Sequence, residues 1–139
     1  METEHLFDVT ITIGEQLSLR GTPDGDRVIA YIAGGQFEGP KLRGEVLAGG
    51  GDWFVVRPDG FGTLDVRIVL KTHDGELIYM TYRGVARMPK ERGEPLRPRT
   101  APTFCVPRAS KYAWLNEVQA VGEGETIKDG IKYRVWTVK

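Results

Sequence analysis

Apolar and polar side chains alternate with a period of two along most of this chain. The pattern is clearest at 7–13 and 64–70, where aliphatic or aromatic residues occupy every second position. Successive side chains of a β-strand point to opposite faces of a sheet, so this alternation predicts half-buried strands. The same pattern predicts further strands at 17–19, 28–32, 42–47, 53–57, 77–84, 112–121 and 131–138. The stretch 110–119 also carries a weak helical pattern, but its aromatic and β-branched flanks favour a strand.

Turn-forming residues separate these segments. Asp24-Gly25 is a hairpin dipeptide, and His73-Asp74-Gly75 predicts a hairpin between the strands at 64–72 and 77–84. The segment 88–102 is rich in proline and charge, which predicts an irregular excursion. About nine or ten short strands with little helix indicate an all-β protein, a sandwich or a barrel. A closed antiparallel β-barrel is favoured because closure removes exposed strand edges.

Composition narrows the class of protein. The 139 residues are enough for one domain, taken as 1–139, and the 19 basic side chains balance 19 acidic ones. This balance argues against nucleic acid or an anionic membrane as a partner. A single cysteine, Cys105, and the lack of a leader-like N-terminus predict a cytoplasmic protein. No segment is long and apolar enough for a membrane helix.

Familiar catalytic signatures are missing. The chain has no glycine-rich nucleotide loop and no nucleophile elbow, and it holds two histidines and one cysteine at no metal-ligand spacing. We therefore expect no cofactor and no metal, and any chemistry should be performed by ordinary side chains.

Four residues are candidates for catalysis. Asp65 and Arg67 share one face of the strand at 64–70, either as an exposed salt bridge or inside a polar lumen. We predict that they point into the barrel, where Arg67 would bind an anionic or carbonyl oxygen. Tyr79 is either a core residue or a proton donor to the same lumen. Asp52 follows three glycines and is either a turn cap or, if buried, an acid or base near neutral pH.

A second group is expected to hold a ligand. Tyr112, Trp114 and Asn116 share one face if 112–121 is a strand. Two aromatic rings and an amide suit a wall that stacks and orients a flat molecule. The alternative is a corner of the core whose polar tips are hydrogen-bonded.

Several motifs resemble those of one bacterial family. The runs FEGPKLRGEVL, GGGDW, RPDG, LDVR, RTAPTF and YAWLN are similar to domain of unknown function 3237, also named uncharacterised protein family 0311. The resemblance spans about 13–122 and implies a lipocalin-like barrel without a settled activity. It adds Glu45, Trp53 and Arg99 to the expected ligand-binding residues. The stretch PKERGEPLRP departs from the family pattern and would reshape the mouth of a pocket.

Two functions are compatible with these observations, besides a structural subunit whose barrel is filled by its own side chains. The first is an enzyme of isomerase, dehydratase (lyase) or cyclase type that moves protons on a small carbonyl-bearing cyclic or aromatic metabolite. The second is a lipocalin-like binder or carrier of an apolar small molecule. A small molecule is the expected partner in both cases, and a homodimer is left open.

Overall fold

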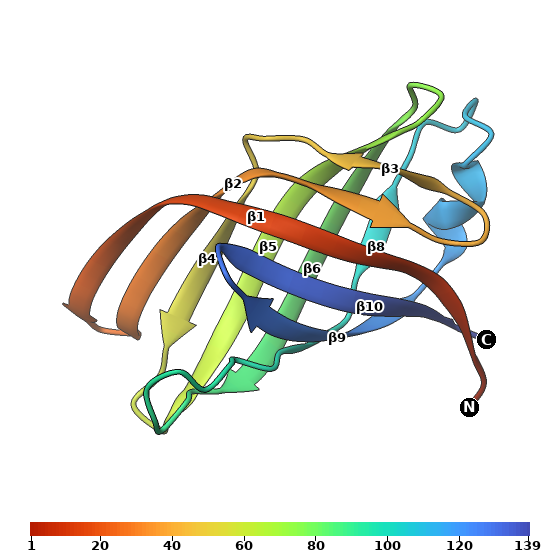
Figure 1. Ribbon diagram of the computed structural model, residues 1–139. Helices are drawn as coiled ribbons and strands as arrows, with labels where there is room; N and C mark the ends of the chain where they lie inside the picture. Colours follow the sequence, from red (N-terminus) through yellow and green to blue (C-terminus); the bar gives the residue numbers. More distant parts are fainter.

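The computed structural model describes residues 1–139 and consists almost entirely of antiparallel strands (Figure 1). The elements in chain order are β1 (Thr3–Thr22), β2 (Gly25–Glu38), β3 (Arg43–Val46), β4 (Gly51–Val56), β5 (Phe61–Thr72), β6 (Leu77–Arg87), β7 (Arg99–Thr100), β8 (Thr103–Cys105), the short helix η1 (Ala113–Glu117), β9 (Ala120–Ile127) and β10 (Gly130–Val138). The predicted all-β barrel class is confirmed. No helix is long and apolar enough to cross a membrane.

The strands close into a ring. Hydrogen-bonded neighbours run from β1 through β2, β4, β5, β6, β7, β9 and β10 back to β1. Both β3 and β4 lie between β2 and β5, and β3 pairs with the C-terminal halves of these two strands. β8 pairs with β6 alone. Closure is uneven because β7 supplies only two residues to bridge β6 and β9.

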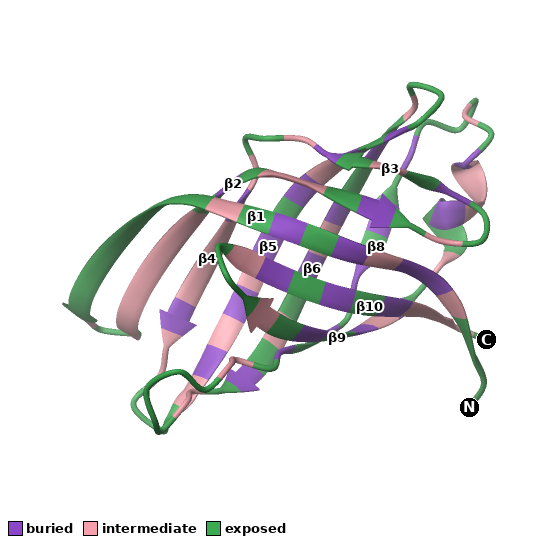
Figure 2. Ribbon diagram, viewed as in Figure 1, coloured by how far each residue is buried: buried purple, intermediate pink, exposed green.

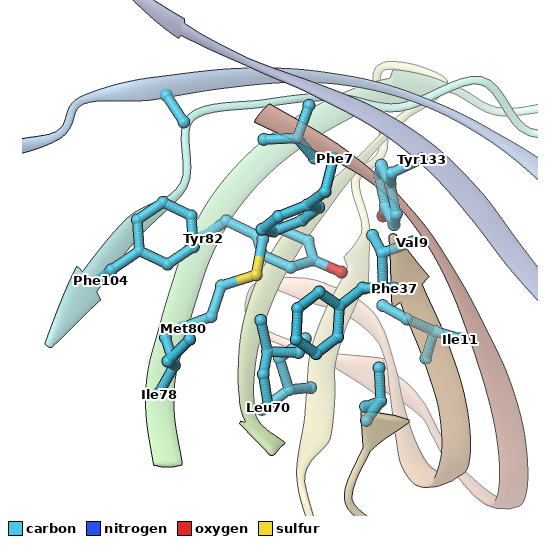
Figure 3. Close-up of a cluster of buried hydrophobic side chains, with 14 of the residues drawn as sticks. Phe7, Val9, Ile11, Phe37, Leu70, Ile78, Met80, Tyr82, Phe104 and Tyr133 are labelled. Atoms are coloured by element: carbon cyan, nitrogen blue, oxygen red, sulfur yellow. The ribbon is translucent and has the colours of Figure 1, made fainter. Parts of the chain in front are cut away.

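One end of the barrel is filled by its own side chains. The ring of Phe7 lies 5.5 Å from Phe37 and 6.1 Å from Phe104, measured between centroids. Figure 3 shows these rings converging with Leu70, Ile78 and Met80. Leu115 of η1 is completely buried, so the short helix packs on this core. The interior of this end is therefore filled by side chains.

The alternating pattern decides which face of each strand is inside. In β5, Leu64, Val66, Ile68 and Leu70 are buried, while the intervening residues are half-buried or exposed (Figure 2). Burying four aliphatic side chains gives about 1.5–3 kcal/mol each. Enclosing the charged pair of the other face would instead cost several kcal/mol per ion. The aliphatic face therefore lines the interior.

Two parts of the predicted strand pattern are wrong. Residues 112–121 are not one strand, because η1 occupies Ala113–Glu117 and β9 begins only at Ala120. Gly122 and Gly124 lie inside β9. In addition, 7–13 and 17–19 belong to the single strand β1, with an irregularity in pairing between Ile13 and Gln16. The predicted hairpin around 73–75 is present between β5 and β6.

Candidate functional site

A cavity of about 280 Å³ occupies the hollow end of the barrel. Its wall is mostly aliphatic and aromatic, with contributions from β1, β2, β4, β5, β6, β9 and β10. Met88 and Leu96, both from the proline-rich segment 88–102, complete the wall. The polar side chains among the lining residues are Asp52, Gln16, Thr126, Tyr82 and Tyr133, and no lysine, arginine or histidine is among them. The cavity is thus apolar with a single carboxyl group.

The strand pattern of β4 turns Asp52 into this cavity. Asp52 pairs with Ala30 of β2 and with Val66 of β5, and both partners line the cavity. Residues directly opposite each other in a sheet point to the same side, so the carboxyl group must point inward too. Phe54, two residues further, also lines the cavity, whereas Trp53 between them points outward.

The hydrogen-bond ladder between β4 and β5 is interrupted beside Asp52. Pairing holds at Asp52–Val66 and resumes at Val55–Thr63, which leaves Trp53 opposite Asp65 and Phe54 opposite Leu64 without ladder pairing. The Asp65 N–H donates instead to Asp52 Oδ1 at 3.1 Å. The Trp53 carbonyl accepts a hydrogen bond from Arg27 Nη1 at 3.1 Å. The gap in the ladder therefore provides the donor that fixes one oxygen of the buried carboxylate.

Burial changes the acidity of Asp52. Desolvation in the apolar wall raises the pKa of this carboxyl from 3.8 to about 6. The nearby Asp65 carboxylate adds to the increase, while the hydrogen bond from the Asp65 N–H opposes it. A carboxyl group with this pKa exchanges protons readily near neutral pH, which an ordinary exposed aspartate does not.

Two tyrosines lie close to Asp52. Tyr82 of β6 and Tyr133 of β10 are buried, with ring centroids 5.3 Å apart in an edge-to-face arrangement (Figure 3). Desolvation and the Asp52 charge raise the pKa of both phenols above their usual value. Gly124 makes room for Tyr133, because a Cβ there would lie 2.5 Å from the ring. Both hydroxyls therefore stay protonated and can donate hydrogen bonds at neutral pH.

Six predicted site residues lie outside the barrel, Arg99 among them. The expectation that Asp65 and Arg67 face the lumen is wrong, because their side chains are 38% and 54% exposed on the outer face. Arg67 lies over the ring of Trp53, with its guanidinium carbon 5.4 Å from the ring centroid. Tyr79 and Glu45 are exposed as well. The charged side chains lie on the outer face because burying a charge without a close partner costs more free energy than leaving it hydrated.

Arg99 lies over a wide depression of about 820 Å³ on the outer surface. This depression forms where β7 is short, and Arg83, Glu123 and Trp136 also border it. It is broad and open, and it contains neither Asp52 nor the two buried tyrosines. The predicted ligand-binding role of Arg99 is therefore separated from the cavity.

The predicted aromatic wall lies at the filled end. The Tyr112 hydroxyl donates to Asp74 Oδ1 at 3.0 Å, which ties η1 to the β5–β6 turn. Asn116 is bound to the backbone of Val106 through bonds of 2.7 and 2.8 Å. Trp114 packs partly buried against the core, with Lys41 over its ring. These three residues hold a loop in place and do not line the cavity, so the alternative of a hydrogen-bonded corner describes them.

The sequence contained a signal for the missed tyrosines. Tyr82 shares its strand face with Ile78 and Met80, whereas Tyr79 shares the other face with Arg83. The face without charges is the inner one, so the alternation already separated an inward tyrosine from an outward one.

The fold and the cavity together define an antiparallel β-barrel with a filled end, a hollow end and a buried acid in the hollow end. The chain belongs to the family described as protein of unknown function (DUF3237), whose model matches residues 1–138. A UPF0311 protein of Clostridium acetobutylicum is 35% identical over 83% of this chain and 80% of its own. The family resemblance noted in the sequence is thereby confirmed.

Solved structures share the fold over almost the whole chain. The crystal structure of a conserved protein of unknown function from Rhodopseudomonas palustris matches with a TM-score of 0.91 and 30% identity, over 99% of this chain and 97% of that one. The crystal structure of an enzyme from Penicillium herquei matches with a TM-score of 0.79 and 24% identity, over 99% and 94%. At this lower identity the likeness concerns the fold.

Proposed function

We propose that the hollow end of the barrel is an active site in which Asp52 moves protons on a small, uncharged and mostly apolar molecule. The observation that carries this proposal is the inward-facing, half-buried carboxyl group with a pKa of about 6 in an otherwise apolar cavity. A group of this pKa is mostly ionised at pH 7, so it can accept a proton and return it in the same turnover.

The neighbouring groups fit such a reaction. Asp52 Oδ1 is held by the Asp65 N–H, which leaves Oδ2 for the substrate. The proton would pass from a C–H or O–H group of the substrate to Oδ2 and return to another atom of the same molecule. Tyr82 and Tyr133 would donate hydrogen bonds to the carbonyl or alkoxide oxygen on which charge develops. The net change is an isomerisation, a dehydration or a cyclisation, and none of these needs an oxidant.

The lining also restricts the charge of the substrate. With no cationic side chain in the wall, an anion would lose its hydration without gaining a partner and would face the Asp52 carboxylate. We expect the neutral dye N-phenyl-1-naphthylamine to bind more tightly than its sulfonated relative 1-anilinonaphthalene-8-sulfonate. The size of the cavity favours a compact ring-containing molecule. One protein with this fold is described as an enzyme, which is compatible with catalysis in a barrel of this kind.

The ring opening of 5-nitrobenzisoxazole tests the proposed base. The base removes the C–H proton, the N–O bond breaks, and a coloured phenolate forms without any cofactor. We expect the rate to rise with pH around a midpoint near 6, as the Asp52 carboxylate forms. Asp52→Asn should reduce the rate to that of free solution. Asp65→Asn should keep the catalysis but move its midpoint to slightly lower pH, because the Asp65 carboxylate contributes to the raised pKa of Asp52. A rate that persists in Asp52→Asn would contradict the proposed role.

A second candidate is a carrier of apolar molecules, which the largely apolar lining favours. Both candidates predict binding of N-phenyl-1-naphthylamine to the native protein and to Asp52→Asn. Only the enzyme predicts that the native protein opens 5-nitrobenzisoxazole faster than Asp52→Asn does. Binding without this difference would favour the carrier.

A further inference from the structure

The distal half of β1 has a free strand edge. β10 pairs with β1 only as far as Thr12, while β2 continues alongside β1 to its end. Residues 14–22 are therefore paired on one side only, and Figure 1 shows this hairpin extending beyond the rest of the barrel. An unpaired edge presents rows of N–H and C=O groups that can bind another strand.

The outer face of this hairpin is largely apolar, with Arg27 opposite Leu19 as a charged exception. Leu17 and Leu19 are 42% and 47% exposed, and Tyr31 on the neighbouring strand is 40% exposed. Leu17 pairs with Ile29, and Ile29 pairs with Trp53, so the apolar row continues across three strands. Figure 2 shows the free end of β1 exposed along its length. An apolar face beside a free edge is typical of a surface that is covered in the assembled protein.

We propose that this edge pairs with the same edge of a second copy of the chain, with Ser18 opposite Ser18. In an antiparallel pair related by a two-fold axis, one residue must face its own counterpart. Ser18 is the midpoint of the free segment 14–22, so this register pairs the largest number of backbone groups. It also places Leu17 opposite Leu19 of the second copy, and the four leucines form one cluster.

The charges of the segment favour a second copy as the occupant. Glu15 and Arg20 are its only charged residues, one near each end. An antiparallel pair brings the acidic end of one copy beside the basic end of the other, whereas a parallel pair would oppose like charges. The same register places Arg20 of the second copy opposite Gln16, which lines the cavity. The dimer would therefore border both cavities.

Sedimentation velocity over a range of protein concentrations tests the dimer. Leu19→Lys should weaken it by about tenfold or more, because each dimer loses two buried leucines and gains two like charges at the edge. Leu77→Lys is the matched control, because Leu77 is 50% exposed on β6, away from the hairpin. It should leave the dimer unchanged. A monomer at all concentrations, or equal effects of the two variants, would overturn the proposal.

A cross-linking experiment tests the register. In a Cys105→Ser background, Ser18→Cys should form an intermolecular disulfide on mild oxidation, since opposed residues lie about 4.5–5.5 Å apart between Cα atoms. Arg20→Cys should not, because its counterpart would lie four residues away along the strand, about 13 Å. Efficient cross-linking through position 20 and none through 18 would exclude the proposed pairing, even if a dimer exists.

Discussion

Replacing Asp52 by asparagine should stabilise the protein in a strongly pH-dependent manner. Asparagine has nearly the same shape, and its carbonyl oxygen can still accept the hydrogen bond from the Asp65 N–H. The substitution therefore removes the ionisable group while keeping the packing and the fixed hydrogen bond. What changes is the cost of holding a charge in the apolar wall.

The magnitude follows from the pKa of this carboxyl, which burial raises from 3.8 to about 6. Because the folded pKa is the higher one, the folded protein binds the proton more tightly, and stability is lost as pH rises from about 4 to about 6. At about 1.4 kcal/mol per unit of pKa, the full loss is about 3 kcal/mol. Asp52→Asn lacks this loss, so its advantage over the native protein should grow by about 3 kcal/mol between pH 3 and pH 7 and then level off.

Urea unfolding followed by tryptophan fluorescence at several pH values measures this difference. Titrations of other groups occur in both proteins and cancel when the two free energies of unfolding are subtracted. Asp65→Asn is the control, and its difference from the native protein should stay within about 1 kcal/mol because that carboxylate is solvated. A difference for Asp52→Asn that is constant over this pH range would refute the buried acid. A difference that shrinks with rising pH would mean that the ionised form is stabilised.

Three further outcomes follow from the positions of the side chains. Arg67→Ala should cost no more than about 1 kcal/mol in urea unfolding, and salt should reduce the loss, because this arginine is on the outer surface. Asn116→Ala removes two hydrogen bonds to the Val106 backbone and should cost about 1–3 kcal/mol in the same measurement. Ala30→Phe narrows the cavity and should abolish N-phenyl-1-naphthylamine fluorescence, whereas Ala33→Phe, at an exposed position of the same strand, should not.

The sequence predicted strands well where one face was purely aliphatic. The segment 64–70 and the hairpin that follows it were predictable because its inner face carries only leucine, isoleucine and valine. The same reasoning should have placed Asp65 and Arg67 outside. Asp65 and Arg67 belong to the motif LDVR, which suggested a functional role. The opposite face, however, is entirely aliphatic and is better suited to the core. A strand has only two faces, and the free energy gained by burying the aliphatic face decides which of them points inward.

The region after 100 was less predictable for a different reason. Tyr112, Trp114 and Asn116 form a corner held by contacts with Asp74 and the Val106 backbone, which are distant in sequence or belong to an irregular loop. Local propensity does not encode such partners. Asp52 was identified as a candidate from its position beside the glycines. Its inward direction, however, depends on pairing with β2 and β5, which the sequence alone does not specify.

The environment of Asp52 argues for a chemical role on energetic grounds. As an ion it costs the folded protein about 3 kcal/mol at neutral pH, a large part of the stability of a typical domain. Its one structural contact is the hydrogen bond from the Asp65 N–H, and an uninterrupted ladder would satisfy that donor through the Trp53 carbonyl. A leucine or valine at this position would extend the apolar wall without either cost. A carboxyl group that lowers the stability of the fold and takes the place of a backbone hydrogen bond is explained if its proton takes part in a reaction. For this reason the proposed function rests on Asp52 and not on the exposed Asp65 and Arg67.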